Sequence, residues 1–274
     1  MNLLSPTQIR DADYKKNVVT LDIETAPSFG AFFELYKEGN ICWTERQWFI
    51  MSMCWKYLGQ TKMYSAAIWD FKEWGKSFCS KCKRIENTDE AEKKLMSKLW
   101  DVLDKAQLII GHNSDQFDIK KLNAKFIKYG FEPPSYYQTV DTKKLQKKVA
   151  KTDSNKLNDL GEFYGLGTKM ETEKDLHKKC LRNDRRAQKQ MVEYNKVDVI
   201  LDEKVYLKLR GWDKNSPNMN VILGGVFNCP ACGSNQAQKH GFRYTKTAVY
   251  QSFRCLNCGK HSQGDKVSKD KVLK

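Results

Sequence analysis

The sequence predicts an α/β layered domain followed by a small cysteine-rich unit. Strand-like runs occupy residues 18–25, 49–57 and 62–68, and beyond them amphipathic helical stretches alternate with short buried runs. This order is typical of a sheet flanked by helices. Two Cys-x-x-Cys-Gly motifs, at 229–233 and 255–259, mark the second unit. A chain of 274 residues is long enough for both units and can bury a substantial core.

Composition indicates a globular protein with a polyanionic partner. Hydrophobic residues make up 40% of the chain and aromatic residues 12%, which is unlike a disordered sequence. The formal net charge of +15 favours nucleic acid as partner. An anionic membrane surface comes second, and a merely basic soluble protein is the remaining alternative. No apolar run approaches the roughly 20 residues of a membrane helix, so no membrane partner is expected.

Cysteine usage and the first residues indicate a reducing compartment. Nine cysteines, an odd number, favour reduced thiols, some of them metal ligands. Residues 1–16 form a polar leader that becomes charged too early for a secretory signal. We expect a cytoplasmic protein, and the excess of lysine over arginine favours a bacterial or virus-infected bacterial cell.

The strand at residues 18–25 carries two carboxylates among β-branched and apolar residues. Because strand side chains alternate between faces, Asp22 and Glu24 share one face and the apolar residues at 19, 21 and 23 share the other. Two like charges so close repel each other, and a bound divalent cation would remove the repulsion. The plain alternative is a strand with one solvated face.

The segments after this strand are less regular. Residues 26–48 are rich in aromatic side chains, and we expect a loop or short helix whose aromatics belong to the core, with base stacking as the alternative. Residues 58–61 predict a turn between the second and third strands. The charged stretch 70–87 predicts irregular structure with Cys79 and Cys82 as free thiols.

Apolar spacing predicts helices and short strands from residue 87 onward. Asn87 or Thr88 caps a helix with an apolar stripe, and short buried strands follow at 108–110 and 137–140. Helical stretches are expected over 122–129, 141–150 and 156–164. Asp118 follows the first of these short strands, at the kind of junction where α/β sheets hold ligands. Its neighbour Asp115 is expected to cap the next helix.

A long helix is predicted from about 184 to 210. Apolar residues at 191, 201 and 205 fall on one stripe with Tyr194 and Asp198. Asp198 therefore lies on the face that packs against the sheet, where a lone carboxylate is costly. A cation shared with Asp22 and Glu24 would stabilise it, and a hydrogen-bonded buried aspartate is the alternative.

Taken together, these motifs resemble the DEDD superfamily of 3'→5' exonucleases. Residues 21–25 (Leu-Asp-Ile-Glu-Thr) are similar to its first motif and residues 112–118 (His-Asn-x-x-x-Phe-Asp) to its second. Residues 194–198 (Tyr-Asn-x-x-Asp) are similar to its third motif in the tyrosine form, because Glu193 occupies the position of the histidine form. The resemblance covers about 17–210 and implies a ribonuclease H-like fold.

The resemblance also implies a chemistry. Two Mg²⁺ or Mn²⁺ ions would be held by Asp22, Glu24, Asp118 and Asp198, with Asp22 bridging both and Asp118 holding the second, directly or through water. Tyr194 would orient the attacking water, while a cation lowers the pKa of that water, because an unperturbed tyrosine pKa near ~10 makes it a poor base. Asn113, in the second motif, is a candidate contact to the nucleic acid.

The cysteine pairs predict a structural zinc site. Cys229, Cys232, Cys255 and Cys258 have the spacing of a closed four-thiolate Zn²⁺ site, each pair followed by the glycine of a tight turn. The segment resembles the zinc ribbons of bacterial transposases. We expect a linker over 211–225, the ribbon over 226–262 and a basic tail over 263–274. Candidate nucleic-acid contacts on the ribbon are Arg243, Tyr244, Lys246, Tyr250 and Arg254.

The function expected from the sequence is metal-dependent 3'→5' hydrolysis of DNA, with the ribbon helping to bind the strand. Alternatives are an exoribonuclease, a structure-specific endonuclease of the same fold, and a catalytically silent nucleic-acid-binding protein. The length leaves no room for a polymerase domain, so a proofreading role would require a separate polymerase or another replication or recombination protein.

Overall fold

The computed structural model describes residues 18–32, 41–76, 78–79, 84–85, 87–223 and 229–267, so the polar leader lies outside the described residues. A five-stranded mixed sheet with the order β5-β4-β1-β8-β9 forms the centre. Its strands are β1 (Val18–Thr25), β4 (Ile50–Tyr57), β5 (Met63–Ala67), β8 (Leu108–Gly111) and β9 (Gln138–Asp141). Strand β1 is antiparallel to β4 and parallel to β8. This mixed α/β architecture agrees with the sequence prediction.

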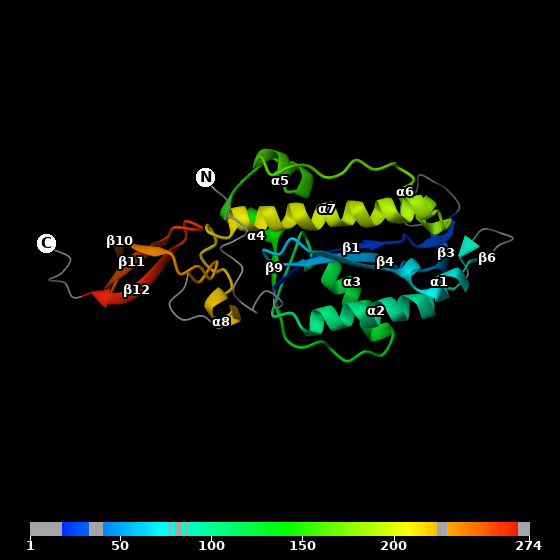
Figure 1. Ribbon diagram of the computed structural model, residues 1–274, viewed down its shortest axis with the longest axis horizontal. Coiled ribbons are helices and arrows are strands. Elements are labelled where there is room, and N and C mark those ends of the chain that lie inside the picture. The colour runs from blue at the N-terminus through cyan, green and yellow to red at the C-terminus, as the bar shows by residue number, and fades with distance from the viewer. Residues whose placement is uncertain are drawn as a thin grey trace.

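Helices cover both faces of this sheet (Figure 1). One face is covered by α7 (Arg185–Leu209), against which α4 (Thr142–Val149), α5 (Leu157–Phe163) and α6 (Leu176–Leu181) also pack. The other face is covered by α2 (Asp89–Asp104) and α3 (Asp118–Lys128). A short turn, η3 (Ile68–Asp70), and α1 (Lys72–Lys76) connect β5 to this second layer.

Strand β1 is buried on both faces. Leu21 and Ile23 belong to the core that includes the apolar stripe of α2, whereas Val18 packs in a second core with residues of α7. The alternation places Asp22 and Glu24 on the α7 side of the sheet, and Asn195 of α7 donates a hydrogen bond to Asp22. A strand with one solvated face is therefore excluded.

The long helix α7 follows its predicted pattern. Asp184 caps it by accepting hydrogen bonds from the backbone N–H groups of Arg186 and Ala187. The stripe residues Met191, Leu201 and Val205 are buried. The apolar stripe thus fixes the rotation of the helix, and this rotation turns Asp198 toward the sheet.

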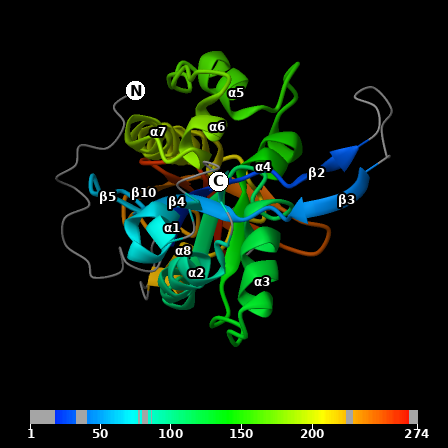
Figure 2. The ribbon, with the colours of Figure 1, turned by 90° about the vertical axis from the view of Figure 1, so that its right-hand side faces the viewer.

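Residues 26–48 differ from the expectation of a loop or helix with core aromatics. They contain β2 (Phe29–Phe32) and β3 (Ile41–Arg46), which form an antiparallel hairpin that projects from the body (Figure 2). Trp43 is 61% exposed and Phe29 is 43% exposed. A two-stranded ribbon without a third layer cannot bury both of its faces, so these aromatics remain accessible.

The stretch 70–87 also has more structure than expected. Besides α1 it contains the short pair β6 (Phe78–Cys79) and β7 (Arg84–Ile85). The interpretation of Cys79 and Cys82 as free thiols falls on side chains outside the described ones.

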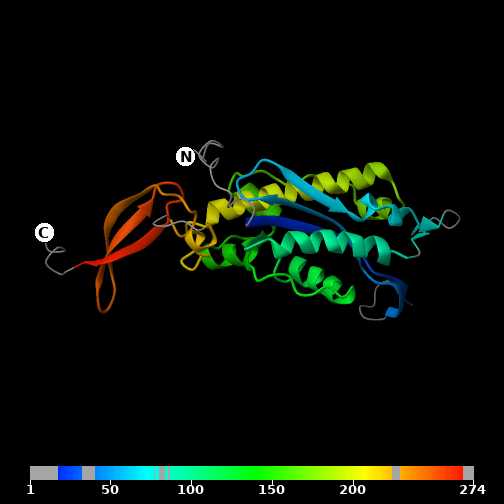
Figure 3. The same cartoon turned by 60° about the horizontal axis from the view of Figure 1, so that its bottom comes forward.

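The C-terminal unit is a three-stranded antiparallel sheet, β10-β11-β12, that extends away from the main body (Figures 1 and 3). Its strands are β10 (Ala237–Tyr244), β11 (Val249–Cys255) and β12 (His261–Val267), so the sheet extends into the expected basic tail. The expected linker contains α8 (Met219–Leu223), whose Met219 and Ile222 are part of the core beside α7. The glycine and proline residues around 211–225 indicated a linker, so the sequence did not predict this short helix.

Several contacts join the C-terminal unit to the main body. The Asp213 carboxylate pairs with Lys148 of α4 at 2.6 Å, and the Asp213 carbonyl accepts a hydrogen bond from Lys260. Gly211 lies so close to the carbonyl of Cys258 that a Cβ there would overlap it. The unit is therefore packed on the end of α7. Within the described residues, every helix is too short or too polar to cross a bilayer.

Candidate active site

Three carboxylates meet between β1 and α7. Asp22, Glu24 and Asp198 each offer an oxygen, and these oxygens lie within 4.8 Å of one another. Asp198 is only 2% exposed, and its Oδ1 has no hydrogen-bond partner among the described residues. Carboxylate oxygens are the ligands that Mg²⁺ and Mn²⁺ prefer, and an unpaired buried oxygen facing the cluster fits such an ion.

Asp118 lies beside this cluster rather than within it. It is the first residue of α3, and its Oδ1 accepts a hydrogen bond of 3.0 Å from the backbone N–H of Ile23. The strand residue between Asp22 and Glu24 thus fixes the Asp118 carboxylate against the same end of β1. This arrangement suits a second cation position, held less directly.

Asp115 does not cap α3, contrary to the expectation. Phe117 is the N-cap residue and makes no side-chain cap hydrogen bond. The Asp115 carboxylate instead pairs with Lys144 at 2.7 Å and is not one of the three clustered carboxylates. The expectation that Asp115 caps this helix is therefore wrong.

Burial and the repulsion of neighbouring carboxylates raise the pKa values of Asp22, Asp118 and Asp198. The pKa of Asp22 lies well above its usual value because of burial and the charges of Asp118, Glu24 and Asp198. Burial raises the pKa of Asp118 to about 7, although hydrogen bonds from backbone N–H groups oppose the shift. Carboxyl groups that resist ionisation in the absence of a counter-charge are suited to binding cations.

Lys169 partly neutralises the cluster and was missed by the sequence reasoning. Its Nζ lies 2.5 Å from Asp198 Oδ2 and 3.3 Å from the Tyr194 hydroxyl oxygen. Burial alone would lower the pKa of Lys169, but the Asp198 carboxylate outweighs burial and raises it. Lys169 lies in a segment without periodicity between α5 and α6, so no pattern pointed to it.

Asn195 and His177 are further neighbours that the sequence did not reveal. Asn195 Nδ2 donates a hydrogen bond of 2.6 Å to Asp22 Oδ2. His177 Nε2 lies 3.3 Å from Glu24 Oε2, and this hydrogen bond raises the pKa of the imidazole. The one sequence feature that could have indicated Asn195 is its position three residues before Asp198, the aspartate of the third motif.

Tyr194 is half-buried beside Asp198. Burial and the Asp198 charge raise the pKa of its hydroxyl, so it stays protonated at neutral pH. A protonated hydroxyl can donate a hydrogen bond to a neighbouring group.

Asn113 lies in the loop between β8 and α3. It adopts a left-handed backbone with φ of 62°, and its N–H donates to Asp141 Oδ1. Its side-chain oxygen accepts a hydrogen bond of 3.3 Å from Lys143, at the start of the lysine-rich helix α4. The side chain of Asn113 is thus held against the N-terminal turn of α4.

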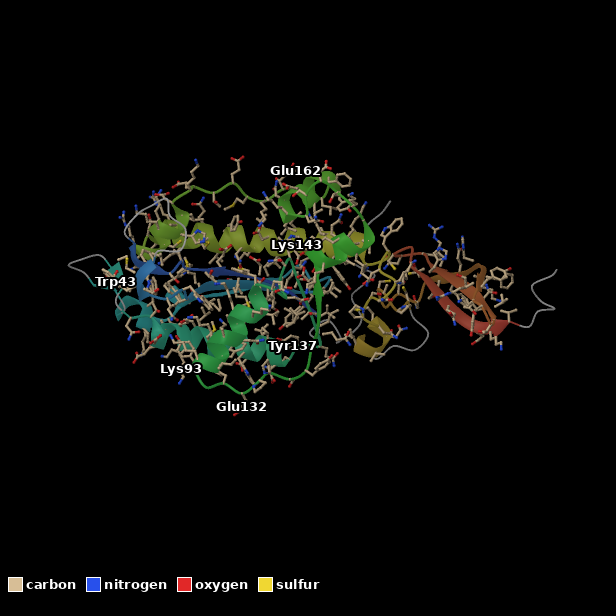
Figure 4. The ribbon with its side chains drawn as sticks, turned by 180° about the vertical axis from the view of Figure 1, so that it is seen from behind. Trp43, Lys93, Glu132, Tyr137, Lys143 and Glu162 are labelled. Carbon is tan, nitrogen blue, oxygen red and sulfur yellow. The ribbon has the colours of Figure 1, made fainter. Side chains whose placement is uncertain are left out.

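A pocket opens next to Glu24. Its lining residues come from the end of β1 and the segment after it, from the segment between β3 and β4, and from α3 and α6: Thr25, Ala26, Pro27, Ser28, Trp48, Lys121 and His177. The volume is about 480 Å³, which is in the range of small-ligand sites. The Lys121 ammonium lies 3.8 Å from the centroid of the Trp48 ring. The β2–β3 hairpin begins at Phe29, directly after the pocket residue Ser28. Trp43, on β3, lies at the end of the molecule opposite the three-stranded sheet (Figure 4).

The four motif cysteines form a second cluster. The sulfur atoms of Cys229, Cys232, Cys255 and Cys258 lie within 4.8 Å of one another. Four sulfur donors on two tight turns fit a closed zinc site. Arg210 at the end of α7 lowers the pKa of the Cys232 thiol, after the larger effect of the Cys229 hydrogen bond.

The candidate nucleic-acid residues of the ribbon lie on the β10–β11 hairpin. Arg243, Tyr244, Lys246 and Arg254 are exposed, and Tyr250 is half-buried opposite Arg243. Asp198 and Arg210 are separated by about 18 Å along the axis of α7, at 1.5 Å per residue. The β10–β11 hairpin, which lies beyond Arg210, is thus separate from the carboxylate cluster.

Comparison with known proteins gives one finding. A family model described as a predicted 3'-5' exonuclease related to the exonuclease domain of PolB matches residues 57–155. The chain is thus similar to predicted nucleases over the segment from β4 to the loop after α4, which includes Asn113 and Asp118. Asp22, Glu24, Tyr194, Asp198 and the cysteines lie outside the match. No curated protein matches the chain in sequence.

Proposed function

We propose that this protein is a metal-dependent 3'→5' exonuclease that hydrolyses phosphodiester bonds of DNA at unpaired 3' ends. The observation that carries the proposal is the convergence of Asp22, Glu24 and Asp198 from β1 and α7, with Asp118 hydrogen-bonded to the same strand. The match to a model of predicted 3'-5' exonucleases supports the same chemistry.

The four carboxylates would hold two divalent cations. Asp22, Glu24 and Asp198 would hold one cation, and Asp118 would contribute to holding the other. Bound Mg²⁺ or Mn²⁺ supplies charge stabilisation of the phosphate and a lowered pKa of the attacking water. Without them, the repulsion within the cluster would oppose approach of a phosphodiester.

Residues of this chain would position the cluster and the substrate. Lys169 neutralises part of the charge at Asp198 and keeps the Tyr194 hydroxyl in place. Tyr194 would orient the attacking water as a hydrogen-bonding partner, because its raised pKa keeps the phenol neutral. Asn195 fixes the orientation of Asp22.

The strand would approach along the basic side of the cluster. Lys143 and Lys144 project from the first turn of α4 beside Asn113, although Lys144 is paired with Asp115. The pocket with Trp48 and Lys121 adjoins Glu24 and offers an apolar ring with an ammonium group, which suits the terminal nucleoside. The ribbon, with a structural Zn²⁺, would bind the strand several nucleotides upstream.

The test is hydrolysis of single strands labelled at the 5' or the 3' end, with Mg²⁺, with Mn²⁺ and with EDTA. The proposal predicts stepwise shortening of the 5'-labelled DNA, released label from the 3'-labelled DNA, and no reaction in EDTA. Asp198→Ala should abolish hydrolysis, while Asp115→Ala in the neighbouring loop should leave it unchanged.

Other outcomes would redirect the assignment. Internal cuts would indicate an endonuclease, and faster degradation of RNA of the same sequence would indicate an exoribonuclease. Binding without cleavage by the wild-type protein, under every metal condition, would contradict the proposal and leave a nucleic-acid-binding protein.

A further inference from the structure

A buried chain of hydrogen bonds lies one helical turn beyond Asp198. Asp202 Oδ1 is 2.5 Å from Thr142 Oγ1, and Thr142 Oγ1 is 2.9 Å from His112 Nδ1. His112 Nε2 is in turn 3.0 Å from the carbonyl oxygen of Asn155. Asp202 is 2% exposed and Thr142 is fully buried. The chain joins α7, the start of α4, the loop after β8 and the segment before α5.

Making all three of these contacts as hydrogen bonds requires one proton more than an ionised Asp202, the Thr142 hydroxyl and a neutral His112 contain together. The Asn155 carbonyl can only accept, so His112 Nε2 carries a proton. If His112 is neutral, Nδ1 accepts the single hydroxyl proton of Thr142. The Thr142 oxygen must then accept from Asp202, which requires a protonated carboxyl group.

The alternative has the same number of protons in a different place. A doubly protonated His112 would donate from Nδ1 to Thr142, which would donate to an ionised Asp202. The two forms differ only in whether the extra proton sits on the carboxyl group or on the imidazole, and in whether two buried charges are present.

The surroundings favour the uncharged form. Burial and the charges of Asp118 on α3, Asp141 on β9 and Asp198 on α7 raise the pKa of Asp202 to about 8, even with the lowering effect that a hydrogen bond donated by Thr142 to an ionised carboxylate would have. Asp202 Oδ2 is buried without a hydrogen-bond partner among the described residues, which would be costly for a charged oxygen.

The surroundings of His112 also favour the uncharged form, because their combined effect lowers the pKa of its imidazole. Burial is the largest effect and lowers the pKa of His112 to about 4. The Asn155 carbonyl and the Asp141 carboxylate oppose this effect, whereas Lys169 and Lys143 add to it.

We propose that Asp202 is a positioning residue that works as a protonated carboxylic acid, donating a hydrogen bond to Thr142. The bond would hold α7 in register with the loop that carries Asn113 and leads to Asp118, and so keep Asp198 aligned with the other carboxylates. The predicted effect of this residue on catalysis rests on the proposed function, whereas its protonated state is independent of that function.

The variants Asp202→Asn and Asp202→Ala test the proposal, with Asp101→Asn on the exposed face of α2 as control. Asparagine keeps a donor for Thr142, whereas alanine removes it. Denaturant unfolding would be measured in EDTA from pH 5 to pH 9. Because the pKa of Asp202 is raised on folding, the stability that Asp202 contributes to the wild type falls as pH rises from ~4, where the unfolded carboxyl ionises, to about 8, where the folded carboxyl ionises.

The unfolding midpoint of Asp202→Asn should therefore increase relative to wild type as pH rises, and Asp101→Asn should show no such trend. A midpoint that falls relative to wild type over this range would overturn the proposal. In ¹⁵N NMR of the wild-type protein, His112 should appear as a neutral Nε2–H imidazole at pH 7. An imidazolium signal at that pH would also overturn it.

Activity measurements separate positioning from general stability. Asp202→Asn should keep kcat within about threefold of wild type, whereas Asp202→Ala should lose up to about 10²-fold in kcat with little change in KM. Equal losses in both variants would refute the positioning role. A wild-type protein without nuclease activity would refute the proposed function instead, and the unfolding and NMR results would still decide the protonation of Asp202.

Discussion

Replacing one clustered carboxylate by an amide should stabilise the metal-free protein while it abolishes hydrolysis. Asp22→Asn keeps the shape of the side chain and the acceptor for Asn195 but removes one negative charge from a cluster whose oxygens lie within 4.8 Å. Two unit charges at this separation repel by about 3 kcal/mol at an effective dielectric constant of ~20.

The net gain should be smaller than the sum of the two removed repulsions. Lys169 attracts Asp22 as well as Asp198, and the raised pKa of Asp22 lets the wild type relieve part of the repulsion by binding a proton. We therefore expect Asp22→Asn to raise the free energy of unfolding by about 1–3 kcal/mol in EDTA at pH 8.

The assay is urea unfolding with and without saturating Mg²⁺. In saturating Mg²⁺ the wild type should be more stable than Asp22→Asn, because the wild type gains binding free energy and the variant does not. Asp115→Asn serves as control, since that carboxylate is paired with Lys144 outside the cluster. An Asp22→Asn protein that is less stable than wild type in EDTA, and that gains as much from Mg²⁺, would refute the reasoning.

Three further predictions concern pH, packing and a buried ion pair. Because the pKa of Asp118 is raised on folding to about 7, metal-free stability should fall as pH increases through 7 and recover with Mg²⁺; a flat pH profile from 5 to 9 would contradict this. Gly211→Ala should cost about 1–3 kcal/mol and loosen zinc retention, because its Cβ would overlap a carbonyl of the cysteine cluster, whereas Gly75→Ala meets no neighbouring atom and should be tolerated. Glu92 is fully buried and bonds a lysine, a tyrosine and the Ile50 N–H, so Glu92→Gln should destabilise the fold by about 3–5 kcal/mol in thermal unfolding. A loss below about 1 kcal/mol would show that the pair contributes little.

The features that the sequence predicted correctly are those set by local periodicity. Alternation along β1 places Asp22 and Glu24 on one face, and the stripe of α7 turns Asp198 toward them. Both rules depend only on the geometry of a single element, so they hold before the tertiary structure is known. The two cysteine motifs likewise bring their four sulfur atoms together, because the spacing within each motif is set by a single tight turn.

The features that the sequence did not predict depend on contacts between segments that are far apart in the chain. Lys169 lies 29 positions from Asp198 in a stretch with no regular period, and it reaches the cluster only because the chain crosses over α7. Phe29 and Trp43 were expected in the core, but a two-stranded hairpin leaves both exposed. The pairing of Asp202 with Thr142 likewise joins two elements that no local pattern relates.

The most direct test of the carboxylate cluster is Mn²⁺ binding followed by electron paramagnetic resonance of the free ion. The account predicts that the wild-type protein removes Mn²⁺ from solution, that Asp198→Asn and Asp22→Asn each lose this binding, and that Asp115→Asn binds like wild type. Undiminished Mn²⁺ binding by both Asp22→Asn and Asp198→Asn would contradict the claim that these side chains hold the catalytic cations.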